Sequence, residues 1–139
     1  MALYVVDANV VVKWFTPEPW ADDALRLLDR GNRFVEPDFM PTEVLNCMLR
    51  KFRKGEVDEP DVLRARAGIR DAFELIDSEP LLDRAMRLSL DRQRDAFDGV
   101  YVSLALDWDC RFVTADRPLH RALAPFYPET MLWVEDIPQ

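Results

Sequence analysis

Short apolar runs alternate along this chain with longer segments in which apolar and charged residues recur at helical spacing. The apolar runs are typical of buried strands, and we predict strands at 3–6, 33–36, 73–76, 111–114 and 131–134. The longer segments predict helices at 20–30, 41–55, 60–72, 80–92, 96–108 and 118–123. Strands that alternate with helices indicate an α/β protein, and we expect a three-layer α/β/α sandwich around a five-stranded parallel sheet.

Proline and glycine mark several of the predicted helix ends. Pro41, Pro60 and Pro80 stand where a proline is tolerated, in the first turn of a helix. Gly31 and Gly55 follow helical segments and are plausible stops. The chain has 139 residues and no linker long enough to divide it, so we expect one domain over residues 1–139.

The composition excludes several kinds of chemistry. His120 is the single histidine, so a ribonuclease mechanism that needs two histidines is impossible. Cys47 and Cys110 are far apart and, with one histidine, cannot build an ordinary zinc site. The four glycines are isolated, which argues against a phosphate-binding glycine loop. Carboxylates are the plentiful reactive group, with 26 Asp and Glu against 18 Lys and Arg.

The net charge of −8 argues mildly against a nucleic-acid partner, because nucleic acid is itself densely negative. The charge is uneven, however: residues 44–70 hold seven basic and four acidic side chains. Four of the basic residues form a cluster, Arg50, Lys51, Arg53 and Lys54. This segment is either a solvated helical face or a local patch that faces phosphates.

The sequence carries no pattern of export or membrane insertion. No apolar stretch approaches the roughly 20 residues that a membrane span needs, and no secretory signal is visible at the start. The sparse cysteines suit a reducing compartment. We therefore expect a cytoplasmic protein with no membrane partner.

Two aspartates follow strands directly, at the positions where α/β proteins bind ligands. Asp7 ends the first predicted strand, and Asp116 lies just past the fourth. Ligands of parallel sheets gather beyond the carboxyl ends of the strands, so the two carboxylates share one crevice if these strands are neighbours. The alternative is that each aspartate only caps the helix that follows it.

Two further acids begin helices. Glu43 lies in the first turn after Pro41, where the helix dipole favours it without any further role. Asn46 would share its face and could hold an oxygen or a water molecule. Asp98 precedes a strongly apolar run, and a carboxylate there needs partners because an unpaired buried charge is costly. Asp95, one turn earlier, is the rival candidate.

Four converging carboxylates without basic partners would repel one another, and a divalent cation would relieve that repulsion. Ligation by oxygen alone selects hard ions such as Mg²⁺ or Mn²⁺. Two such ions could activate water and stabilise the leaving oxygen of a phosphodiester. This chemistry needs no histidine, cysteine or glycine loop.

These acids lie in four segments that resemble the motifs of the PIN domain family of metal-dependent nucleases, specifically the VapC-type toxins of toxin–antitoxin pairs. The segments are VDAN at 6–9, PTEVLN at 41–46, FDGVYVSLA at 97–105 and VTAD at 113–116. Each motif is weak alone, but all four occur in the family's order and span nearly the whole chain. Two departures are small: Gly99 stands where alanine is usual, and Asn9 where serine or threonine is common.

The resemblance implies that Asp7, Glu43, Asp98 and Asp116 are the catalytic acids and bind Mg²⁺ or Mn²⁺. It also implies that Asn9 and Thr114 support them through hydrogen bonds, and that the first and fourth strands are adjacent. A Mg²⁺-dependent endoribonuclease toxin is therefore expected, with an RNA substrate, a cognate antitoxin and a homodimeric assembly. A PIN nuclease of RNA processing, or a non-catalytic module that binds RNA or protein through residues 50–70, is the alternative.

Overall fold

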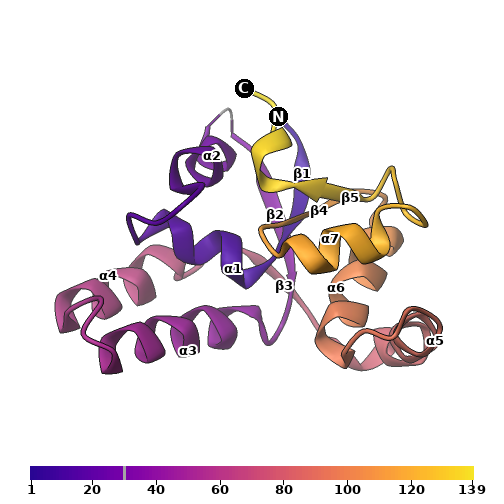
Figure 1. The fold of residues 1–139 in the computed structure, drawn as a ribbon, viewed down its shortest axis with the longest axis horizontal. Helices are drawn as coiled ribbons and strands as arrows, with labels where there is room; N and C mark the ends of the chain where they lie inside the picture. Colours follow the sequence, from indigo (N-terminus) through magenta and orange to yellow (C-terminus); the bar gives the residue numbers. More distant parts are fainter. Residues whose placement is uncertain (30) are drawn as a thin grey trace.

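A five-stranded sheet runs through the centre of the protein (Figure 1). The computed structural model describes residues 1–29 and 31–139. The strand order is β3-β2-β1-β4-β5, and all four neighbouring pairs are parallel. The strands are β1 (Leu3–Val6), β2 (Arg33–Pro37), β3 (Glu74–Ile76), β4 (Arg111–Thr114) and β5 (Met131–Trp133).

Helices lie on both sides of this sheet, so the predicted three-layer α/β/α fold is confirmed (Figure 1). The α-helices of the described residues are α1 (Ala8–Val11), α2 (Ala21–Leu25), α3 (Met40–Arg53), α4 (Glu59–Ile69), α5 (Leu82–Arg92), α6 (Ala96–Asp107) and α7 (Arg117–Leu123). Within the residues described, none of these helices combines the length and the apolar character needed to cross a membrane.

Helix α6 forms the centre of the core. It packs against β1, β2 and β4, and α5 covers its other side. The backbone of α5 approaches so closely that a Cβ on Gly99 would lie 2.6 Å from the carbonyl oxygen of Ala85. Alanine would therefore force the two helices apart, which explains why glycine stands at this position.

The order of the strands brings the two central motifs together. Strands β1 and β4 are neighbours, with Val6 opposite Val113, as the resemblance implied. The amide of Asp7 donates to the carbonyl oxygen of Val113 at 2.9 Å. Asp7 and Asp116 therefore leave the sheet at the same edge.

Polar side chains fix where the helices begin. Asp95 accepts a hydrogen bond from the amide of Asp98 at 2.8 Å and caps α6. Asp116 accepts from the amide of Leu119 at 3.1 Å and caps α7. Such caps satisfy amides that have no partner within the helix. The expectation that Asp116 could serve as a cap is thus confirmed, and it leaves one carboxylate oxygen outside that bond.

The elements differ from the predictions in three places. Helix α1 and the 3₁₀ turn Val12–Trp14 were not predicted, because three consecutive valines, residues 10–12, give the segment no helical spacing. The helix predicted at 20–30 is the short α2 followed by a 3₁₀ turn, Arg26–Leu28, and its predicted end at Arg30 lies outside the described residues. The last strand stops at Trp133, since Val134 begins another 3₁₀ turn.

Candidate active site

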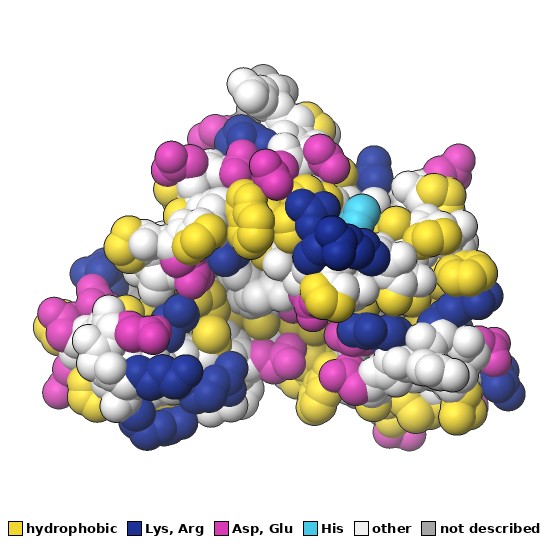
Figure 2. Space-filling view, viewed as in Figure 1, with side chains coloured by type: hydrophobic (Ala, Val, Ile, Leu, Met, Phe, Trp, Pro, Cys, Tyr) yellow, Lys and Arg dark blue, Asp and Glu magenta, His cyan; other side chains and the backbone are white. Residues whose placement is uncertain are grey.

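Four acidic residues stand at the starts of four different helices, around the carboxyl ends of β1 and β4. Asp7 precedes α1, Glu43 lies in the first turn of α3, Asp98 in the first turn of α6, and Asp116 caps α7. Figure 1 shows these helix starts facing the gap between α3 and the α5–α6 pair. Acidic side chains border the hollow seen there in Figure 2. The topology thus gathers the four predicted acids in one region.

Asp7 is held by two side chains that the resemblance placed beside it. The hydroxyl of Thr114 donates to Asp7 Oδ2 at 2.9 Å, and Asn9 Nδ2 donates to the same oxygen at 3.2 Å. Thr114 and Asn9 in turn accept from the amides of Asp116 and Ala115, at 3.0 and 3.1 Å. This network connects β1 with the end of β4 and fixes the orientation of the Asp7 carboxylate.

Glu43 and Asp98 each have a partner that was not predicted. The hydroxyl of Tyr101 donates to Glu43 Oε1 at 2.6 Å. The guanidinium of Arg94 contacts Asp98 Oδ2 at 3.2 Å. Tyr101 lies one turn after Asp98 in the sequence, but nothing in the sequence shows that it meets a residue 58 positions earlier.

Burial, and then neighbouring negative charges, raise the pKa values of three of these acids. Burial is the main cause for Asp7, whose pKa rises to about 7, and the charges of Asp98 and Glu43 add to it. Burial, then the charge of Asp95, raises the pKa of Asp98 to about 6 despite the opposing Arg94. The pKa of Glu43 is also raised by burial, although the hydrogen bond from Tyr101 opposes this.

A fifth carboxyl group, Glu36 of β2, lies behind Asp7 and was not predicted. Its side chain is fully buried, and Oε2 accepts a hydrogen bond from the amide of Val6 at 2.8 Å. Burial, and then the charge of Asp7, raise its pKa well above the ordinary value. This shift favours the protonated form of Glu36, and its hydrogen bond with Val6 anchors the end of β1.

The other predicted residues lie farther out. Asn46 is exposed and borders a shallow groove beside Glu43. Asp95 caps α6, and its charge raises the pKa values of both Glu43 and Asp98, so it lies at the margin of the cluster.

The basic cluster of the sequence lies at the far end of α3 from Glu43. Arg50, Arg53 and Lys54 are exposed there. Lys51 instead donates to Glu18 Oε2 at 3.0 Å and lies 3.8 Å from Glu56. Its charge is thus neutralised within the protein, and Lys51 is the weakest candidate of the four for binding a phosphate.

The donor set suits a hard divalent cation. Asp7, Glu43, Asp98 and Asp116 offer only oxygen atoms. Burial, and then the charges of neighbouring carboxylates, raise the pKa values of Asp7 and Asp98, and a cation would relieve that repulsion. Over residues 1–29 and 31–139, no three acidic, histidine or cysteine side chains are already arranged as a metal-binding group. Glu43 and Asp98 are instead turned toward Tyr101 and Arg94. A cation bound through those oxygens would replace these two contacts.

The sequence matches the PIN domain family over residues 4–123, and the chain belongs to that family. No curated protein matches it significantly.

Several solved structures share the fold. The crystal structure of PAE2754 from Pyrobaculum aerophilum has 22% sequence identity and a TM-score of 0.72, and the match covers 96% of this chain and 85% of that one. A toxin–antitoxin complex from Klebsiella pneumoniae matches with 16% identity, a TM-score of 0.66 and coverages of 99% and 100%. VapBC2 from Rickettsia felis, bound to a DNA fragment from its promoter, matches with 15% identity, a TM-score of 0.63 and coverages of 94% and 98%.

Proposed function

We propose that this protein is a Mg²⁺-dependent endoribonuclease and the toxin of a toxin–antitoxin pair. The observation that carries the proposal is the convergence of Asp7, Glu43, Asp98 and Asp116 at one edge of the sheet of a PIN domain. PIN domains are generally nucleases, and an all-oxygen acidic site is suited to hydrolysis of a phosphodiester assisted by divalent cations.

The four acids would hold Mg²⁺ or Mn²⁺, which would lower the pKa of water and stabilise negative charge on the leaving oxygen. Asp7 is the central ligand in this proposal, because Thr114 and Asn9 fix its carboxylate. Arg94 now neutralises Asp98, and it becomes available to a phosphate oxygen when Asp98 turns to a cation. The hydrogen bond from Tyr101 orients the carboxylate of Glu43.

The toxin assignment rests on the architecture of the neighbours. Two of the solved structures with this fold are described as a toxin–antitoxin complex and as VapBC2, and their matched chains correspond to this one almost end to end. A cognate antitoxin that covers the acidic site is therefore part of the proposal. A homodimer is also proposed, since exposed apolar side chains such as Leu49, Phe52 and Leu63 are typical of surfaces that bind protein.

Cleavage of RNA by the purified protein tests the proposed function. We expect a single-stranded RNA to be cut in Mg²⁺, to remain intact in EDTA, and to be cut again when Mn²⁺ is added. The ends should carry a 5′-phosphate and a 3′-hydroxyl, because attack by water, not by the 2′-hydroxyl, opens the bond. Equal cleavage in EDTA, or 2′,3′-cyclic phosphate ends, would contradict the mechanism.

The Thr114→Val variant tests how Asp7 is positioned. Valine keeps the shape of the buried side chain but removes the hydroxyl that donates to Asp7 and accepts from Asp116. We expect RNA cleavage to fall about tenfold, as when partners of metal ligands are lost, and the free energy of unfolding to fall by about 1–2 kcal/mol. Thr114→Ser keeps the hydroxyl, and we expect it to cleave RNA nearly as fast as the parent. If Thr114→Val cleaves as fast as the parent, this hydrogen bond has no role in positioning.

A further inference from the structure

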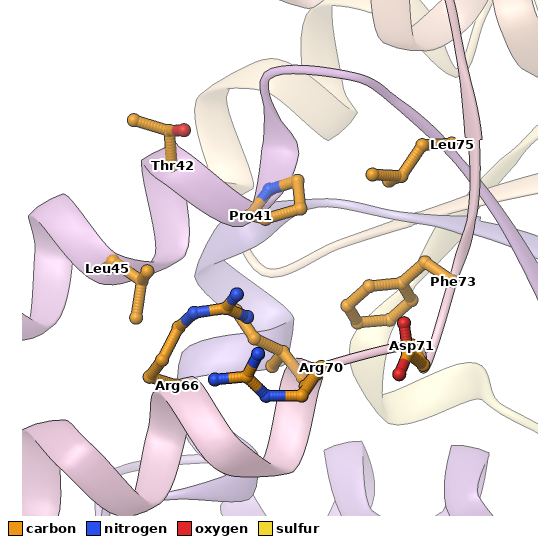
Figure 3. A pocket seen from close by; sticks show the side chains of 9 residues that line it. Pro41, Thr42, Leu45, Arg66, Arg70, Asp71, Phe73 and Leu75 are labelled. Atoms are coloured by element: carbon orange, nitrogen blue, oxygen red, sulfur yellow. The ribbon is translucent and has the colours of Figure 1, made fainter.

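A pocket of about 450 Å³ lies between the first turns of α3, the end of α4 and strand β3. Figure 3 shows its walls: Pro41, Thr42 and Leu45 on one side, and Phe73 and Leu75 on the other. Arg66 and Arg70 reach across it from the end of α4. A volume of this size accommodates one small ligand of the size of a nucleotide.

The two arginines give the pocket a strong preference for an anion. Arg66 and Arg70 are one helical turn apart, where like charges repel, and Figure 3 shows both guanidinium groups directed into the same space. In the part of the chain that the structure describes, neither forms an ion pair. Their neighbour Arg64 is different, since it pairs with Asp61. Two convergent guanidinium groups are the usual ligands of a phosphate.

The opposite wall suits a planar, uncharged ring. Phe73 is half-buried, and its ring is braced by Trp14 and Phe34, each with its centroid 6.1 Å away. Leu75 beside it is 50% exposed. Nucleobases that are not paired stack on such fixed aromatic rings. Asp71 also lines the pocket, and its carboxylate can accept hydrogen bonds from ribose hydroxyls.

The pocket lies next to the acidic cluster. Thr42 and Leu45 line it, and the same two residues line the neighbouring groove of about 340 Å³ that contains Glu43 and Phe97. Phe97 is 51% exposed and directly precedes Asp98. An extended strand that occupies the pocket can therefore continue over the first turn of α3 to the four acids.

We propose that this pocket binds one nucleotide of single-stranded RNA that flanks the bond to be cut. Arg66 and Arg70 bind its phosphate, and Phe73 stacks on its base. The inference rests on the proposed function for the identity of the polymer, but the binding of a nucleotide can be tested separately. It also locates the phosphate-binding part of the basic segment at residues 66 and 70, away from the exposed end of α3.

Titration of the full-length protein with uridine and adenosine 5′-monophosphate, in EDTA and followed by amide chemical shifts, tests the site. We expect shifts around residues 66–75, and binding at least fivefold tighter than that of ribose 5-phosphate, which lacks the base. Arg66→Gln and Arg70→Gln should each weaken nucleotide binding at least fivefold. Arg64→Gln removes the same charge from the same helix and should change it less than twofold.

Cleavage kinetics then connect the pocket to the substrate. With a short RNA substrate, Arg66→Gln and Arg70→Gln should raise KM at least fivefold and change kcat less than threefold, while Arg64→Gln changes neither. Nucleotide binding that is unaltered in both variants would overturn the proposal, and so would binding of acidic peptides in place of nucleotides. If the parent protein cuts no RNA, the proposed function fails, and the titration still decides whether the pocket binds a nucleotide.

Discussion

Cleavage of RNA should fall at least a hundredfold when Asp7 is replaced with asparagine. Asparagine has the same shape and can still accept the hydrogen bonds from Thr114 and Asn9, so the fold is kept. What is lost is the negative charge at the centre of the acidic cluster. Because loss of a mere supporting partner costs about ten- to a hundredfold at metal sites, loss of the central ligand should cost more. Single-turnover cleavage in Mg²⁺ measures this directly.

The same variant should be more stable than the parent at pH 8, which separates loss of catalysis from loss of folding. Burial of the ionised Asp7 is unfavourable, as its pKa of about 7 shows, and asparagine carries no charge. Asp107→Asn is the matched control, because Asp107 is an exposed acid paired with Arg84. It should leave cleavage within twofold of the parent. Full activity in Asp7→Asn would refute the proposed site.

The protein without metal should lose stability as the pH rises from about 4 to 8. Asp7 and Asp98 have pKa values of about 7 and 6 in the folded protein, against 3.8 when unfolded. The folded state therefore binds more protons in this range, and its stability falls as these protons are released. At about 1.4 kcal/mol per pKa unit, Asp7 alone accounts for roughly 4 kcal/mol. Glu43 and Glu36, whose pKa values are also raised, act in the same direction.

His120 opposes this trend, because burial lowers its pKa and its deprotonation favours the folded state. Urea unfolding in EDTA at several pH values gives the free energy of unfolding of both proteins. The difference between the parent and Asp7→Asn at each pH isolates the contribution of Asp7. Addition of Mg²⁺ should raise the free energy of unfolding of the parent strongly at pH 8 and little at pH 5, where Asp7 and Asp98 are protonated. If the free energy of unfolding changes equally with pH in the two proteins, Asp7 is not the carboxylate whose ionisation destabilises the fold.

The sequence was sufficient to predict the sheet. Each of the five strands contains at least two adjacent apolar residues, and each overlaps its predicted range. Helix α1 could not be predicted in this way. Val10, Val11 and Val12 are all buried, so no exposed side of the helix produces a periodic pattern. The structure of this segment is set by packing between the sheet and α3.

The placement of the four acids could be predicted from the sequence because it depends on where strands end and helices start. Their partners could not, because each contact depends on how separate elements pack. Tyr101 meets Glu43 only because α6 crosses beside the start of α3. Glu36 reads as an ordinary strand residue and is in fact fully buried. The sequence also does not show which basic side chains lack an acidic partner. Lys51 is paired with Glu18, whereas Arg66 and Arg70 line a pocket.

The most direct test of the central claim is an anomalous difference map from crystals of the protein soaked in Mn²⁺ above pH 7.5. At this pH the carboxyl groups of Asp7 and Asp98 are ionised and free to bind a cation. We expect a peak within coordination distance of Asp7 and of at least two of Glu43, Asp98 and Asp116, with Asp98 turned away from Arg94. A map with no peak at this edge of the sheet, or with manganese bound only elsewhere, would contradict the account.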